Sequence, residues 1–167
     1  LAASQTWKKV QNIANQGKDN LEITNLLSLG NGKILITIPI AQTTFCDAFT
    51  FDGEEWNKIF ENEYIKSLRL SEGKLIKIAY RSLNIYDVNN LVNGGEIYHL
   101  SDEWNPVHGI HLDINDAIID SQDLWLAHQT KGLIRLKDYR NGTHNKSEHF
   151  PDSPKSNHIY SITASED

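Results

Sequence analysis

The sequence predicts an all-β protein made of β-propeller blades, which are four-stranded antiparallel sheets arranged around an axis. Three observations predict it: a recurring Ile-led apolar segment, a polar turn within each copy, and short apolar runs after it. The copies begin at Ile23, Ile65, Ile114 and Ile159, at intervals of 42, 49 and 45 residues. Periods of about 40 to 50 residues built from short strands are typical of propeller blades, which cannot bury both faces alone.

Each of the first three copies opens with a predicted β-hairpin. The hairpins span residues 23–36, 65–78 and 114–127, each as strand, polar turn and strand. Gly32 and Gly73 fall at the turns of the first two, where glycine adopts positive φ at little steric cost. Ser121-Gln122-Asp123 takes the same place in the third copy.

Two more short strands follow each hairpin and complete a blade. Third strands are expected at 48–51, 83–86 and 133–136, and fourth strands at 56–60, 96–100 and 147–150. The turn pairs Asp52-Gly53, Gly94-Gly95 and Asn141-Gly142 lie between them. We therefore expect about three four-stranded antiparallel blades, over residues 23–60, 65–100 and 114–150.

The segments that flank these blades are predicted to be single strands of incomplete neighbouring blades. Residues 7–10 read as an outer strand, and residues 159–162 read as the first strand of a next blade. A closed propeller needs about four blades or more to hide its sheet edges. We therefore expect residues 1–167 to be a fragment of a larger propeller, with the remaining blades as its partners and a homodimer as a further candidate.

Composition indicates a folded chain and excludes two classes of partner. Of 167 residues, 39% are hydrophobic and 23% are charged, and the net charge is −6. With this acidic balance and no basic cluster, we expect no nucleic-acid partner. No apolar stretch approaches the roughly 18 residues of a membrane span, so we expect no membrane insertion within this segment. Cys46 is the one cysteine and is expected to fill space in the core.

One stretch resembles a known family. Residues 115–127, Asn-Asp-Ala-Ile-Ile-Asp-Ser-Gln-Asp-Leu-Trp-Leu-Ala, followed by Gly-Leu-Ile-Arg-Leu at 132–136, resemble the two-component regulator propeller repeat. Residues 48–56 are similar to its Phe-Asp-Gly linker with a following Trp, and residues 109–114 to its entry into the first strand. The chain departs from the repeat at Ala127-His128, where the family has Gly-Thr, and at Leu35 and Ile76, where it has Trp.

The resemblance implies a function that periodicity does not show. Such propellers form the extracytoplasmic sensor part of hybrid two-component histidine kinases, so it implies a periplasmic or extracytoplasmic segment that senses an oligosaccharide. A histidine kinase module would then lie elsewhere in the parent chain, and this segment would not be an enzyme. Two alternatives stay open: a protein-interaction propeller scaffold and a carbohydrate-active propeller enzyme.

Loops at one end of the blades are the expected ligand-binding site, because binding residues favour loops held by a rigid scaffold. These loops connect second to third strands and fourth to first strands. Aromatic faces beside hydrogen-bonding groups suit a sugar. The candidates are Trp104, His108, His111, Tyr80, Arg81, His128 and Gln129.

Several of these residues have alternative roles. Trp104 has packing between blades as its alternative role, and Trp7, Trp56 and Trp125 on predicted strands are expected to pack rather than bind. His108, His111 and Asp113 have metal-ligand spacing, but no fourth ligand is evident, so no metal and no cofactor are expected. Adjacent carboxylates at 102–103 point opposite ways in an extended chain, which disfavours glycoside hydrolysis and a catalytic residue there.

Overall fold

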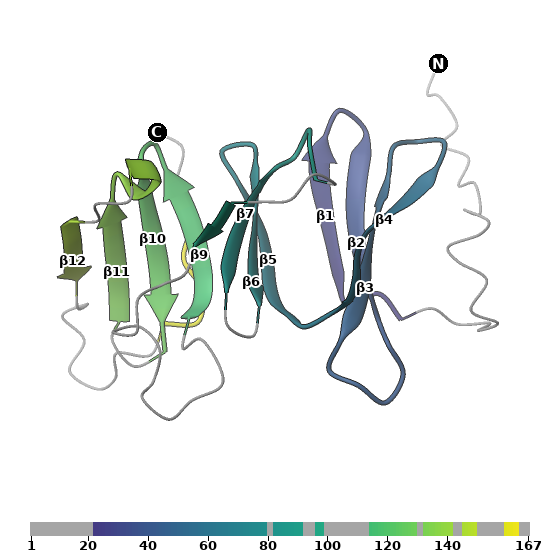
Figure 1. Cartoon of the computed structure of the whole chain (residues 1–167), viewed down its shortest axis with the longest axis horizontal. Coiled ribbons are helices and arrows are strands. Elements are labelled where there is room, and N and C mark those ends of the chain that lie inside the picture. The colour runs from purple at the N-terminus through teal and green to yellow at the C-terminus, as the bar shows by residue number, and fades with distance from the viewer. Residues whose placement is uncertain are drawn as a thin grey trace, which may run out of the picture.

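A computed structural model describes residues 22–79, 82–91, 96–98, 114–129, 132–141, 145–149 and 159–163 of the chain. The described residues form three separate four-stranded antiparallel sheets, stacked side by side along the long axis of the molecule (Figure 1). Each sheet is built from four strands that are consecutive in sequence and neighbours in space. The predicted all-β fold is confirmed.

The three sheets follow one another along the chain. Sheet 1 contains β1 (Asn25–Gly30), β2 (Lys33–Pro39), β3 (Cys46–Phe51) and β4 (Trp56–Glu63). Sheet 2 contains β5 (Ile65–Ser71), β6 (Lys74–Ala79), β7 (Leu83–Asp87) and β8 (Glu96–Tyr98). Sheet 3 contains β9 (Ile114–Asp120), β10 (Asp123–His128), β11 (Gly132–Lys137) and β12 (Asn145–His149), with a short 3₁₀ helix at Tyr139–Asn141 before β12.

Tight turns join the first two strands of every sheet, as the sequence predicts. Asn31 and Gly32 have φ of 52° and 76°, and Glu72 and Gly73 have φ of 47° and 67°. Two consecutive positive φ values match the right-handed twist of the flanking strands, and glycine at the second position relieves the steric cost. In sheet 3, Ser121 has φ of 58° at the equivalent turn.

Several boundaries differ from those expected. β3 begins at Cys46 rather than Ala48, and β4 continues to Glu63 through Asn62, which has φ of 52°. The predicted strand at 7–10 lies outside the described residues. Residues 159–163 are described and have no strand assignment, so the first strand expected at 159–162 is not formed. Its Ile162 N–H is donated to a side chain, Asp116, instead of a strand neighbour.

Most of the core lies in the two seams between sheets, and a smaller buried cluster lies within sheet 1. Alternate residues on each strand point to opposite faces, so the sheet in the middle contributes apolar side chains to both seams. Between sheets 1 and 2 the buried cluster is Leu29, Leu35, Ala48, Phe60, Leu68, Leu75, Tyr86 and Leu91. Between sheets 2 and 3 it includes Ile76, Ile78, Leu83, Ile85, Ile119, Leu124, Leu126, Ile134 and Leu136. Stacking is therefore what buries both faces of sheet 2.

Trp56 and the cysteine take packing positions. Trp56 packs beside Ile36, Ile38 and Phe49. Cys46 is buried at 7% exposure, and burial raises the pKa of its thiol above the ordinary value, as expected for a space-filling residue. In the part of the chain that the structure describes, no helix is long and apolar enough to cross a membrane.

Candidate functional site

The turns and loops between strands lie at two opposite ends of the stacked sheets. The β1–β2, β5–β6 and β9–β10 turns lie at one end, which is the upper end in Figure 1. The β2–β3 loop and the passage from β4 to β5 lie at the opposite, lower end (Figure 1). The lower end is therefore where the sequence analysis places a ligand, and we call it the loop end.

The described residues cover only part of the predicted site. His128 is the last residue of β10 and is 2% exposed, so its imidazole is buried rather than presented to solvent. Gln129, which follows it, is exposed. The other five candidates, Tyr80, Arg81, Trp104, His108 and His111, lie outside the described residues. Ligand binding by these residues stays a prediction.

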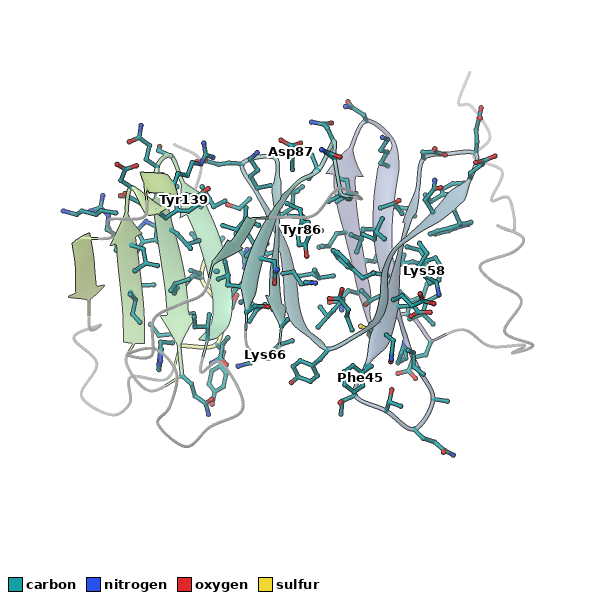
Figure 2. All side chains as sticks on the ribbon, in the orientation of Figure 1. Phe45, Lys58, Lys66, Tyr86, Asp87 and Tyr139 are labelled. Atoms are coloured by element: carbon teal, nitrogen blue, oxygen red, sulfur yellow. The ribbon has the colours of Figure 1, made fainter. Side chains whose placement is uncertain are left out.

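Phe45 is a candidate that the sequence analysis missed. It lies at the loop end (Figure 2) and its side chain is 42% exposed, which is unusual for a large aromatic residue. The loop that carries it is held by its own hydrogen bonds. Ile40 N–H donates to Phe45 O at 2.9 Å, and Thr43 donates its N–H and its hydroxyl to Ile40 O at 3.1 and 2.9 Å. These hydrogen bonds hold the backbone of the loop that presents the ring.

Lys66 adds a polar group at the same end. It is the second residue of β5, it is half-buried, and Figure 2 shows it near the lower end of sheet 2. Phe45, Lys66 and Gln129 thus place an aromatic face, an ammonium group that already has a partner, and an amide at the loop end, each on a different sheet. An aromatic face suits the C–H surface of a sugar, and an amide has a donor and an acceptor for its hydroxyls.

The upper end differs from the loop end, because two of its carboxylates accept hydrogen bonds from backbone N–H groups of the turns. Asp52 accepts the N–H groups of Glu54 and Glu55 at 3.0 and 2.9 Å, and these hydrogen bonds lower the pKa of its carboxyl. Asp123 accepts the Asp138 N–H at 3.1 Å and pairs with Arg135, which is the larger cause of its lowered pKa. These carboxylates stabilise turns rather than form a catalytic pair.

Metal binding has no support among the described residues. No group of three or more His, Cys, Asp or Glu side chains in those ranges is arranged to hold an ion. The sequence-derived candidates His108 and His111 lie outside these ranges, so the expectation that they bind no metal stays a prediction.

Solved structures show what the fold is similar to. The extracellular domain of BT4673 from B. thetaiotaomicron, described as a one-component system, matches with a TM-score of 0.53 and 16% identity. The match covers 90% of this chain and 19% of that chain. PorZ, a surface component of the type-IX secretion system of Porphyromonas gingivalis, matches with a TM-score of 0.57 and 13% identity over 84% of this chain and 23% of that one.

These neighbours are propeller-like domains. The fold is that of stacked β-propeller blades. At these identities the likeness shows the fold alone, and the chain spans about a fifth of the length of either structure. No protein-family model and no curated protein matches the sequence.

Proposed function

We propose that this chain is a ligand-sensing segment of an extracytoplasmic β-propeller in a two-component-type regulator, and that its ligand is an oligosaccharide. The observation that carries the proposal is the agreement between two independent features. The 115–136 stretch resembles the two-component regulator propeller repeat, and the fold matches the extracellular domain of a bacterial one-component system over 90% of this chain.

The loop end supports a sugar as the ligand. Phe45 combines high exposure with a hydrogen-bonded loop, so binding would order few additional groups and cost little conformational entropy. Gln129 follows β10 in sheet 3, at the same end of the stack, and its amide has donors and an acceptor for sugar hydroxyls. A sensor also requires that the ligand bind one arrangement of the sheets better than another, because only differential affinity shifts an equilibrium.

Binding and turnover of an oligosaccharide panel test the proposal. Calorimetry should show binding without cleavage, and Phe45→Ala should weaken that binding by about tenfold, since fully burying a Phe side chain contributes about 1.5–3 kcal/mol and Phe45 is only partly exposed before binding. Leu26→Ala is the matched control, because Leu26 is 66% exposed on β1, outside the proposed site, and its loss should leave binding unchanged. Release of smaller sugars would overturn the sensor proposal and indicate an enzyme.

A protein-interaction scaffold is the second candidate function, and the similarity to PorZ favours it. PorZ is described as an essential surface component of a secretion system, and its structure matches this chain with a TM-score of 0.57. If no oligosaccharide binds while Phe45→Ala leaves the fold intact, the sensor proposal fails and the loop end is better explained as a contact surface for another polypeptide.

A further inference from the structure

A carboxylate and a cation pair across each of the two seams. At the seam between sheets 2 and 3, Arg69 of β5 donates to the Asp116 carboxylate of β9 at 2.5 Å. At the seam between sheets 1 and 2, Lys77 of β6 pairs with Glu63, the last residue of β4. The two carboxylates differ in how many other donors reach them.

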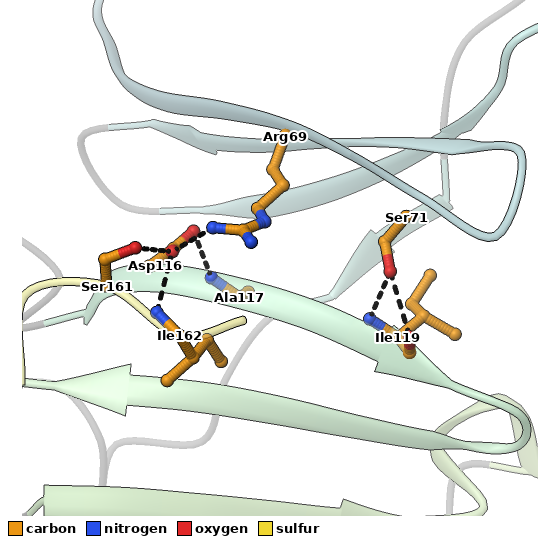
Figure 3. Close-up of polar contacts among 7 residues, drawn as sticks. All are labelled: Arg69, Ser71, Asp116, Ala117, Ile119, Ser161 and Ile162. Carbon is orange, nitrogen blue, oxygen red and sulfur yellow. Dashed lines mark hydrogen bonds and ion pairs between the residues drawn. The ribbon is translucent and has the colours of Figure 1, made fainter. Parts of the chain in front are cut away.

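The Asp116 carboxylate is occupied by donors of the protein. Its Oδ1 accepts the Ala117 N–H at 2.9 Å. Its Oδ2 accepts Arg69, the Ser161 hydroxyl and the Ile162 N–H, at 2.5, 3.0 and 3.1 Å (Figure 3). Asp116 is also 5% exposed, so its role is to hold the seam together.

Glu63 keeps an acceptor that the described residues do not use. Its Oε2 pairs with the Lys77 ammonium, and no other donor among the described residues reaches its carboxylate. The one buried side-chain N or O atom without a partner in those residues is Trp56 Nε1, so Glu63 Oε1 is accessible to solvent. An ionised carboxylate accepts through both oxygens, so Oε1 can take hydrogen bonds from a ligand.

Lys77 is held inside the seam in a place where packing does not require a charge. Its ammonium lies 4.2 and 5.4 Å from the ring centroids of Phe60 and Tyr86. It is the fourth residue of its strand, and the fourth residues of β2 and β10 are Ile36 and Leu126, which are both buried. A buried ion pair is often no more stabilising than aliphatic packing. The structure therefore gives Lys77 a purpose other than filling the seam, which is to hold the Glu63 carboxylate.

Glu63 lies beside Phe45 at the loop end. Cys46 and Glu63 are opposite each other in the β3–β4 ladder, and Phe45 directly precedes Cys46. The Cα atoms of Phe45 and Glu63 are thus on the order of 6 Å apart. Both residues are partly exposed. Neighbouring units of one oligosaccharide can therefore contact the ring and the carboxylate together.

We propose that Glu63 is a ligand-binding residue of the oligosaccharide site, that Lys77 is its positioning residue, and that the site selects neutral oligosaccharides over acidic ones. The proposal rests on the sugar-sensing function proposed above. Glu63 Oε1 accepts sugar hydroxyls in charge-assisted hydrogen bonds, which are stronger than neutral ones. The side chain of Lys77 is 4% exposed and that of Glu63 is 39% exposed, so an acidic sugar meets the carboxylate first and is repelled.

Matched pairs of sugars test the selectivity by calorimetry. Cellotriose, maltotriose and mannotriose are each compared with the form in which their primary alcohols are oxidised to carboxylates. At least one neutral trisaccharide should bind, and its oxidised form should bind roughly tenfold more weakly or less. No binding by any of these sugars would overturn the sugar-sensing function together with this inference. An oxidised form that binds as tightly as its parent would overturn the inference alone.

Variants of the pair assign the selectivity to Glu63 and Lys77. Glu63→Gln should weaken binding of the neutral sugar by roughly tenfold and narrow the difference between the two forms, because it removes the charged acceptor. Lys77→Met should also weaken neutral binding but widen that difference, because the remaining carboxylate has lost its counter-charge. General destabilisation would weaken binding of both forms alike. The double variant has neither charge and should bind the two forms with similar affinity, which keeps the measurement possible if Glu63→Gln does not fold.

Glu61→Gln is the matched control. Glu61 lies on the same strand, its side chain is 77% exposed, and it pairs with Lys58 rather than across the seam. This change should leave both affinities unaltered. Neutral binding and selectivity that stay at the native level in Glu63→Gln, or in the double variant, would overturn the assignment.

Discussion

Lys77 on β6 offers a sharp test of how the seam between sheets 1 and 2 is stabilised. Its side chain is 4% exposed and forms an ion pair with Glu63, whose own side chain is 39% exposed. The ammonium also lies over the Phe60 and Tyr86 rings, at 4.2 and 5.4 Å from their centroids (Figure 2 labels Tyr86). The pair is therefore asymmetric: one charge is buried and the other is partly hydrated.

Removing the two charges should have unequal effects. Glu63→Gln leaves a buried ammonium without its counter-charge, which costs about 3–5 kcal/mol for fully buried pairs. Partial hydration of Glu63 and the two aromatic faces reduce that cost, and cation–π contacts contribute about 0.5–2 kcal/mol, so we expect a loss of about 2 kcal/mol. Lys77→Met removes the buried charge and keeps an unbranched apolar chain in the seam, so we expect a loss below about 1 kcal/mol.

The double variant decides between this account and simple loss of a contact. Lys77→Met should restore stability to the Glu63→Gln protein, because it removes the unpaired charge. Urea unfolding followed by tryptophan fluorescence measures all four proteins, with a common m-value as the check that the unfolded states are comparable. If the double variant is less stable than Glu63→Gln alone, or if Lys77→Met costs more than Glu63→Gln, the reasoning is refuted.

Two further predictions concern the other seam and one turn. Ser71→Ala should lower the free energy of unfolding by about 1–3 kcal/mol, because it leaves the Ile119 N–H without its partner at the seam, whereas Ser28→Ala on the exposed face of β1 should change it little; equal losses in urea unfolding would contradict this role. Asp123 has a lowered pKa, so its ion pair with Arg135 stabilises the fold above the ordinary carboxyl pKa of 3.8 and stops doing so as pH falls through the lowered value. Acid unfolding curves should therefore be shallower in Asp123→Asn, and an unchanged curve would contradict the assignment.

The sheets and their hairpins could be predicted because their signals are local. Alternating apolar residues mark each strand, and Gly32 and Gly73 mark turns that require positive φ. The extension of β4 could not be predicted, because it depends on a contact across the sheet. Asp47 accepts the Asn62 N–H at 2.9 Å and pairs with Lys58, which fixes the irregular end of the strand.

The candidate site was predicted less completely, and for a similar reason. The sequence places Phe45 next to a strand, where an aromatic residue is expected to pack, and only the hydrogen-bonded loop turns it outward. His128 follows an apolar strand and was expected in a loop, yet it ends the strand and is buried. The segment at 159–163 has the pattern of a strand, but pairing requires a neighbouring strand, and β9 offers it side-chain contacts instead.

The chain order of the sheets has a consequence for how the protein unfolds. Each sheet consists of four strands that are consecutive in sequence. The two large buried clusters each join one pair of adjacent sheets. Stability in such an array is approximately a sum over single units and nearest-neighbour interfaces, as in a one-dimensional lattice. A weakened seam therefore becomes a boundary at which cooperativity breaks, and one part of the stack can open while the rest stays folded.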